Sequence, residues 1–192
     1  MANYASTEVS ILGNDKEINE LYNLMVSLEN MKEPAVKNGF GTTWLGCLVE
    51  ALGSSWQEVS CRGEWSCLEL NDGIITFSTE SAWSAPIEVF DFIKQKFPSI
   101  EIFFLSTEPG CEYYVVNDPE GRFYPDRYIV DLCTADEEYL TEYFEDLETA
   151  LDWINEQTDS NVKSEEDVET LNDKLAAENE NAFCYLHEIE II

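Results

Sequence analysis

The chain has 192 residues, of which 40 are Asp or Glu and 10 are Lys or Arg, so its formal net charge is −30. Hydrophobic residues make up 44% and aromatic residues 12% of the chain, enough to form a buried core and to argue against wholesale disorder. The charge excludes direct binding to nucleic acid or anionic membranes, because both need a basic surface. With no signal-peptide pattern and no apolar run of transmembrane length, we expect a cytoplasmic protein.

The N-terminal part predicts a strand, a helix and a loop. Residues 6–12 form a β-rich segment, and Asn14 with Glu17 gives a variant of the capping box at the start of a helix that runs to about residue 30. Residues 31–43 contain one proline and two glycines and are typical of a loop. The apolar run at 44–52 suits either a short helix or a strand.

The middle of the chain predicts two hairpins that flank a helix. The β-rich segments 64–70 and 74–79 are joined by Asn71-Asp72-Gly73, residues that tolerate positive φ. The helix that follows has Ser84 as its candidate N-cap and Pro86 in its first turn. Further strands are expected at 100–106, 112–116 and 122–130.

The last third predicts acidic helices and a closing strand. We interpret residues 139–144 as a strand, followed by a helix over 147–157 that Asp146 caps, although a longer helix starting at Thr134 also fits. A second acidic helix begins after a polar break, and residues 183–192 form the closing strand.

Together these elements predict an α+β fold: a mainly antiparallel sheet with ferredoxin-like βαβ pieces, helices on one face, and an acidic helical C-terminal part. We expect an α+β core over residues 1–130. Residues 131–192 are expected to form an acidic helical extension whose final strand joins the same domain.

Three short motifs carry a family resemblance: Trp83-Ser84-Ala85-Pro86 at a helix start, Phe97-Pro98 at its end, and the Glu108-Pro109-Gly110 turn. With the strands around them, residues 38–116 resemble the YubB ferredoxin-like domain of plasmids, phages and other mobile elements. The segment Cys111-Glu112-Tyr113-Tyr114 departs from the family pattern, which has a glycine there. The resemblance implies an α+β sheet with helices on one face, and it implies no activity.

The sequence contains no recognisable catalytic, cofactor or metal motif, so we expect a protein that is not an enzyme and binds no cofactor or metal. The six cysteines form no C-x-x-C pair and are expected to be reduced, buried and structural. The only histidine, His187, is expected to pack on the last strand beside Tyr185. Among 40 carboxylates, no general acid and base can be singled out.

The negative charge is concentrated at the C-terminal end. Residues 131–192 hold 20 acids and two bases, a net charge of −18, whereas residues 1–130 have a net charge of −12. One explanation is a solvated surface that keeps the protein soluble. The other is mimicry of nucleic acid: duplex DNA carries one charge per ~1.7 Å of axis, and regularly spaced carboxylates can occupy a basic cleft.

From this pattern we predict a protein that binds the basic surface of a nucleic-acid-binding protein, such as a host restriction or CRISPR nuclease, and inhibits it. The alternative is an accessory module that binds a protein or peptide through a sheet edge or aromatic loop, with the charge serving only solubility. The predicted partner-binding residues are Asp136, Glu137, Glu138, Glu142, Glu145, Asp146, Glu148, Asp152 and, as an exposed aromatic, Trp44.

Overall fold

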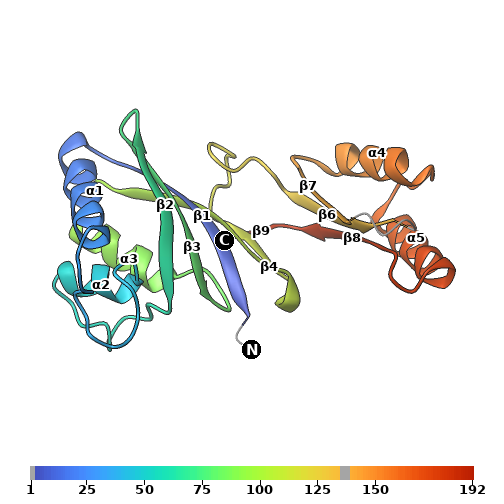
Figure 1. The fold of residues 1–192 in the computed structure, drawn as a ribbon. Helices are drawn as coiled ribbons and strands as arrows, with labels where there is room; N and C mark the ends of the chain where they lie inside the picture. Colours follow the sequence, from blue (N-terminus) through green and yellow to red (C-terminus); the bar gives the residue numbers. More distant parts are fainter. Residues whose placement is uncertain (1–2, 135–138) are drawn as a thin grey trace. The chain divides into compact units, whose positions relative to one another are not determined.

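The computed structural model describes residues 3–134 and 139–192 (Figure 1). The chain divides into two compact units, Met1–Asn117 and Asp118–Ile192, which we describe separately as the first and second unit. The predicted α+β class is confirmed, with helices and antiparallel strands in both units. The expected division at residue 130 falls inside strand β6 (Tyr128–Cys133), whereas the structure divides the chain between Asn117 and Asp118.

The first unit has the ferredoxin-like topology that the sequence predicts. Its strands pair antiparallel in the order β2-β3-β1-β4-β5, and the chain order β1-α1-β2-β3-α3-β4 makes two split βαβ units. Helix α2 and strand β5 are additions to that pattern. The elements are β1 (Tyr4–Leu12), α1 (Asp15–Glu29), α2 (Leu45–Ala51), β2 (Gly63–Asn71), β3 (Ile74–Ala82), α3 (Ile87–Lys96), β4 (Glu101–Glu108), a short 3-10 turn (Pro109–Cys111) and β5 (Tyr113–Val116).

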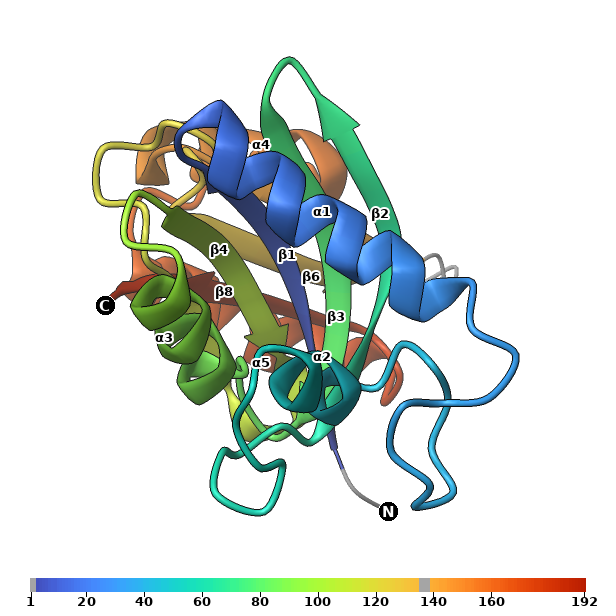
Figure 2. The same cartoon turned by 90° about the vertical axis from the view of Figure 1, so that its left-hand side faces the viewer.

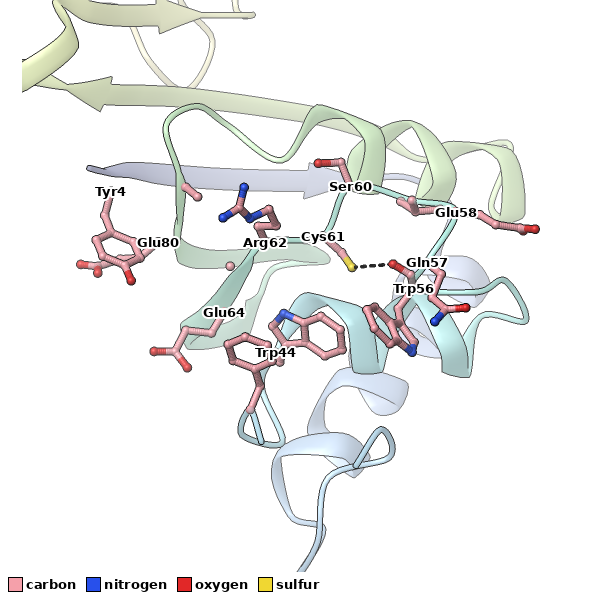
Figure 3. A pocket seen from close by; sticks show the side chains of 14 residues that line it. Tyr4, Trp44, Trp56, Gln57, Glu58, Ser60, Cys61, Arg62, Glu64 and Glu80 are labelled. Carbon is pink, nitrogen blue, oxygen red and sulfur yellow. Dashed lines mark hydrogen bonds between the residues drawn. The ribbon is translucent and has the colours of Figure 1, made fainter. Parts of the chain in front are cut away.

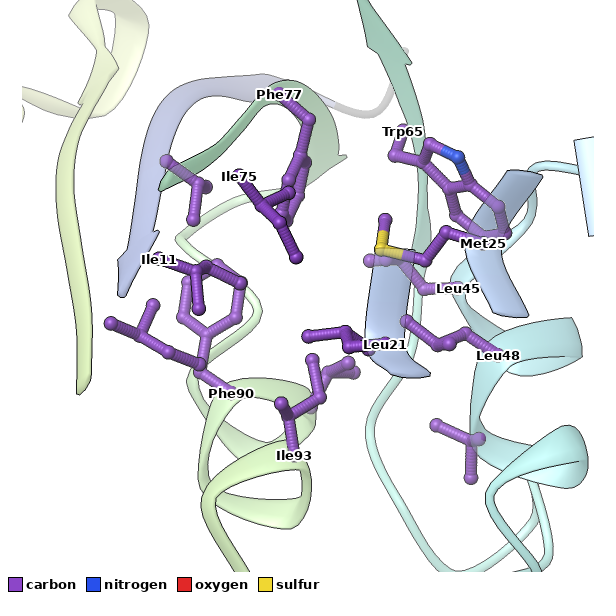
Figure 4. Close-up of a cluster of buried hydrophobic side chains, with 14 of the residues drawn as sticks. Ile11, Leu21, Met25, Leu45, Leu48, Trp65, Ile75, Phe77, Phe90 and Ile93 are labelled. Atoms are coloured by element: carbon purple, nitrogen blue, oxygen red, sulfur yellow. The ribbon is translucent and has the colours of Figure 1, made fainter. Parts of the chain in front are cut away.

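The three helices of the first unit cover one face of its sheet, as predicted (Figure 2). Apolar side chains from the inward face of the strands meet the apolar stripes of the helices in one large cluster. Ile11, Trp65 and Phe90 are all at most 2% exposed there (Figure 4). The indole nitrogen of Trp65 donates a hydrogen bond to Glu29 Oε1 at 3.0 Å, so the polar atom of this buried ring is satisfied.

Local signals explain where the helices of this unit begin. The Asn14 side chain accepts a hydrogen bond from the Glu17 backbone N–H at 3.0 Å, which confirms the predicted cap. The prediction of Ser84 as the cap of α3 is wrong: Pro86 occupies the N-cap position, and the Ser84 carbonyl accepts a hydrogen bond from Ser81 Oγ. The ambiguous run at 44–52 forms helix α2.

The second unit has a sheet of its own. Strands β6 (Tyr128–Cys133), β7 (Tyr139–Phe144) and β8 (Phe183–Glu188) pair antiparallel in the order β7-β6-β8. Helices α4 (Leu147–Thr158) and α5 (Glu165–Glu178) pack their apolar stripes against Val130 and Leu132 on one face of this sheet. The C-terminal part is therefore an α+β unit with its own apolar cluster, where the sequence predicted a helical extension.

The element boundaries of the second unit confirm some predictions and correct others. Residues 139–144 form the preferred strand, and Asp146 caps α4 by accepting a hydrogen bond from the Thr149 N–H at 2.9 Å. The strand expected at 122–130 begins only at Tyr128, because the preceding loop folds around Asp118. The closing strand is divided into β8 and a short β9 (Glu190–Ile191).

Candidate functional site

Two helices of the second unit present rows of carboxylates at a spacing of four residues. We call these rows the carboxylate ladders: Glu148, Asp152 and Glu156 on α4, and Glu165, Glu169 and Asp173 on α5. All six residues are exposed. Since four residues of an α-helix rise about 6 Å, each ladder presents one carboxylate per turn along one side of its helix.

The ladders are held in place by the apolar residues of the same helices. Ala150, Leu151 and Ile154 bury one side of α4, and Val168 and Leu171 bury one side of α5. The Ser164 side chain caps α5 by accepting a hydrogen bond from the Asp167 N–H. The carboxylates therefore project from anchored, capped helices rather than from a flexible acidic tail.

The few basic residues of the second unit do not neutralise the ladders. In the part of the chain that the structure describes, no ladder carboxylate forms an ion pair with a lysine or arginine. The guanidinium of Arg127 instead donates hydrogen bonds to the backbone carbonyls of Asp118, Tyr124 and Asp126 at 2.7–2.9 Å. With 23 acids against four bases, this unit has a net charge of −19 over 75 residues.

The remaining predicted carboxylates have different surroundings. Glu142 on β7 and Glu145 in the following turn are exposed, but neither belongs to a ladder. Asp146 is exposed too, yet its side chain is engaged as the cap of α4 and contributes to local structure. Asp136, Glu137 and Glu138 lie outside the described residues.

Trp44 is not the exposed aromatic that the sequence predicted, since its side chain is only 5% exposed. It stacks on Phe40, with ring centroids 5.1 Å apart, and meets Trp56 edge to face at 5.5 Å. Its indole lies over Gly46 in the first turn of α2, so closely that a Cβ on that glycine would lie 2.1 Å from the ring. Trp44 nevertheless contributes to the wall of a pocket.

The pocket lies in the first unit, near the start of β2, and has a volume of about 990 Å³. Figure 3 shows Tyr4 and Glu80 at one end, Trp56 and Gln57 at the other, and Arg62 and Cys61 between them. The 14 lining residues are Tyr4, Phe40, Trp44, Trp56, Gln57, Glu58, Val59, Ser60, Cys61, Arg62, Gly63, Glu64, Glu80 and Ala82.

Backbone contacts hold the segments that form this pocket. The Trp65 N–H donates to the Thr43 carbonyl at 3.0 Å and joins the aromatic loop to β2. The Ser60 N–H donates to Glu88 Oε2 on α3 at 2.8 Å, and the Cys61 thiol donates to the Trp56 carbonyl at 3.5 Å. The pocket is therefore largely pre-formed, as is usual for ligand sites.

The histidine lies beside a buried carboxylate on the sheet of the second unit. Asp131 Oδ1 accepts hydrogen bonds from the hydroxyls of Tyr139 at 3.0 Å and Thr141 at 2.6 Å. His187 Nε2 lies 3.7 Å from Asp131 Oδ2, and its ring centroid is 6.2 Å from that of Tyr185, as the strand alternation predicted. These contacts give His187 a packing role.

The six cysteines form no disulfide. Four of them are buried as predicted, whereas Cys67 and Cys111 are exposed, so the prediction is wrong for these two. Burial raises the pKa of Cys61 to about 11 and that of Cys184 to about 12, so both remain protonated thiols at neutral pH. Within residues 3–134 and 139–192, no group of three or more His, Cys, Asp or Glu side chains could hold a metal ion. No helix in the same ranges is long and apolar enough to cross a bilayer.

The sequence prediction missed two features of these surfaces. The ladder on α5 was visible as acids four residues apart in a predicted helix, but only the β7–α4 segment and the residues before it were selected. The pocket had no local signal beyond its aromatic residues. Its lining residues come from several short segments between residues 4 and 82, and these segments meet only in the folded unit.

Comparisons with protein-family models, with curated proteins and with solved structures find no match for this chain. The resemblance to YubB domains therefore stays a prediction, and the functional argument depends on the geometry of the two surfaces described above.

Proposed function

We propose that this protein is a non-enzymatic, acidic binding protein whose second unit engages the basic nucleic-acid-binding surface of another protein. The observation that carries the proposal is the pair of carboxylate ladders, which are exposed, anchored and without lysine or arginine partners among the described residues. A basic cleft that normally receives phosphates would receive these carboxylates instead, and the partner would be blocked from nucleic acid.

The spacing of the ladders sets the strength of this mimicry. Each ladder carries one carboxylate per ~6 Å, whereas one strand of B-DNA carries one phosphate per ~3.4 Å of axis. A single ladder thus has about half the linear charge density of one DNA strand. Binding should therefore require both ladders together with neighbouring carboxylates such as Glu142, and it should weaken steeply with salt.

The experiment is affinity capture from a bacterial lysate on the immobilised full chain, with elution in a salt gradient and identification by mass spectrometry. A matched column carries a variant with one ladder neutralised: Glu148→Gln, Asp152→Asn and Glu156→Gln. We expect the wild-type column to retain a nucleic-acid-binding protein that moderate salt or added duplex DNA releases. The variant column should retain much less of it.

The capture experiment also separates this proposal from the alternative of an interaction module whose charge serves only solubility. An interface of aromatic or strand-addition type would survive ~0.5 M salt, where the Debye length is only about 4 Å. A partner that resists such salt, is not displaced by DNA, and binds the neutralised variant equally well would contradict the proposal.

A further inference from the structure

The pocket of the first unit is not used by the carboxylate ladders and has the size of a ligand site. Its volume of about 990 Å³ is at the upper end of the range of roughly 300–1,000 Å³ that is usual for small-molecule and cofactor sites. All of its lining residues belong to the first unit, so the pocket is complete without any residue of the second unit.

Four aromatic residues line the pocket, and two of them, Phe40 and Tyr4, are open to solvent. Phe40 is 59% exposed and Tyr4 is 61% exposed, although burying such rings would normally stabilise a fold. Phe40 uses one face to stack on Trp44, and Trp56 completes the aromatic wall. Exposed aromatic faces at the rim of a pocket are typical of an interaction site, and such faces attract cations.

The charged residues of the pocket favour a cation over an anion. Glu58, Glu64 and Glu80 line it together with a single base, Arg62, and all four are exposed. None of the four forms an ion pair with any residue in the described part of the chain, so the three carboxylates are not neutralised by Arg62. The local charge of −2, in a chain of −30, attracts cations and repels anions.

We propose that this pocket binds a lysine or arginine side chain presented by a peptide segment of a partner. The cationic head would lie over the aromatic faces and near the glutamates, and its aliphatic stem would contact the rings. Only observations on the first unit support this proposal. The proposal therefore does not depend on the function that we assign to the carboxylate ladders.

The direct test is a titration of the full chain with the acetylated, amidated tripeptide Ala-Arg-Ala, followed by NMR of the tryptophan indole N–H signals. The control peptide replaces arginine with citrulline, which has nearly the same shape but no charge. We expect saturable shifts of the Trp44 and Trp56 signals with the arginine peptide, and an affinity at least about five-fold lower for citrulline. The Trp153 signal in the second unit reports non-specific binding of the cation to the acidic helices.

Single-residue variants test the direction in which each side chain changes the affinity for the arginine peptide. Removing the competing cation with Arg62→Gln should tighten binding of the arginine peptide about two- to five-fold, and Glu64→Gln should weaken it by a similar factor. Trp56→Leu should weaken binding further by removing an aromatic wall. Each variant is first checked for a native-like NMR spectrum, so that unfolding is not mistaken for lost binding.

Three results would overturn the proposal. Equal binding of the arginine and citrulline peptides would show that charge has no role. Weaker binding of the arginine peptide by Arg62→Gln would show that Arg62 supports binding of the peptide and does not compete with its cation. Shifts of Trp153 alone, with the Trp44 and Trp56 signals unchanged at millimolar peptide, would place the binding on the acidic helices.

Discussion

The two units of this protein differ in opposite directions: the first has the larger buried apolar cluster, and the second has the greater negative charge. The first unit buries a large cluster that includes Trp65, Phe90 and many aliphatic side chains, and its 117 residues carry a net charge of −11. The second unit buries a smaller cluster, yet its 75 residues carry −19. Like-charge repulsion opposes compactness, so the unit with less apolar burial also bears the greater electrostatic cost.

This difference indicates what each unit can contribute to binding. The first unit has enough core to hold aromatic side chains at its surface around a pre-formed pocket. In the second unit, the carboxylate ladders reduce stability because their members repel one another, which is the kind of feature that function rather than folding explains. A partner with a basic surface would relieve this repulsion on binding.

The largest expected effect tests whether the two units are independent. Ile154→Ala removes a fully buried side chain from the cluster of the second unit and should destabilise that unit by about 2–5 kcal/mol. Hydrogen exchange measured by mass spectrometry should accelerate over residues 118–192 and stay unchanged over residues 3–117. Faster exchange in both units would show that they unfold together.

The next effect tests how the aromatic wall of the pocket is built. Gly46→Ala would place a Cβ 2.1 Å from the Trp44 ring, so the indole or the helix must shift, at a cost of about 1–3 kcal/mol. Thermal denaturation measures the loss. The matched control is Gly41→Ala, where a Cβ would have no atom within 4 Å. Equal stability of the two variants would contradict the placement of Trp44.

Salt should affect the second unit more than the first. The ladders contain four like-charge pairs at i, i+4, each of which costs about 0.2–0.5 kcal/mol in an exposed helix. Raising NaCl from low concentration to ~0.5 M should therefore stabilise the second unit by about 1–2 kcal/mol. Hydrogen exchange at the two salt concentrations measures the change in stability of each unit. An equal increase in the stability of both units would contradict the expected difference in their response to salt.

Acid should weaken the loop that leads into β6. Burial alone would raise the pKa of Asp118, but hydrogen bonds from the backbone N–H groups of Phe123, Tyr124 and Arg122 outweigh it and hold the pKa below its usual value. Because the folded pKa is lowered, this stabilisation is present above the unfolded value of about 3.8 and is lost as the pH falls through the folded value.

The variant Asp118→Asn isolates this contribution. Its stability should be lower than that of the wild type by a constant amount above pH ~5, and the difference should shrink as the pH falls below ~4. Denaturant unfolding at a series of pH values measures both curves. A difference that does not change with pH would show that the carboxylate charge is unimportant in the loop.

The smallest expected effect is a difference in the rates at which the cysteines are alkylated, and it involves no change in stability. Cys67 and Cys111 are exposed, and hydrogen bonding to Glu108 together with burial raises the pKa of Cys111. Iodoacetamide at pH 8 should therefore modify Cys67 first and Cys111 more slowly, because the thiolate is the reactive form. The four buried cysteines should react only after unfolding, and mass spectrometry of the native protein would reveal any exception.

Much of the fold could be predicted because its signals are local. The Asn14 cap lies next to the residues that it organises. The Asn71-Asp72-Gly73 turn is equally local, since Asp72 and Gly73 adopt the positive φ that the hairpin needs. The short run at 44–52 was ambiguous because seven helical residues show too little periodicity to distinguish a helix from a strand.

The pocket of the first unit was less predictable because it depends on contacts between segments that are distant in the sequence. The pocket requires Trp44 to fold over Gly46 and the segment around Trp56 to be tied to α3 through Ser60 and Glu88, and neither contact has a local signature. The boundary between the units lies at Asn117 and Asp118, within a loop where composition does not change. The two ladders, in contrast, are local patterns of acids four residues apart in predicted helices, and of their members only Glu148 and Asp152 were among the predicted binding residues.

The most direct test of the central claim compares equal losses of charge in the two units, using the partner recovered by affinity capture. One variant neutralises the α4 ladder (Glu148→Gln, Asp152→Asn, Glu156→Gln), and the other neutralises three exposed acids of the first unit (Glu20→Gln, Glu101→Gln, Glu112→Gln). We predict that the ladder variant binds at least about ten-fold more weakly, with a shallower dependence on salt, and that the first-unit variant binds like the wild type. Equal weakening by both variants would contradict the account, because binding would then depend on net charge and not on the ladder.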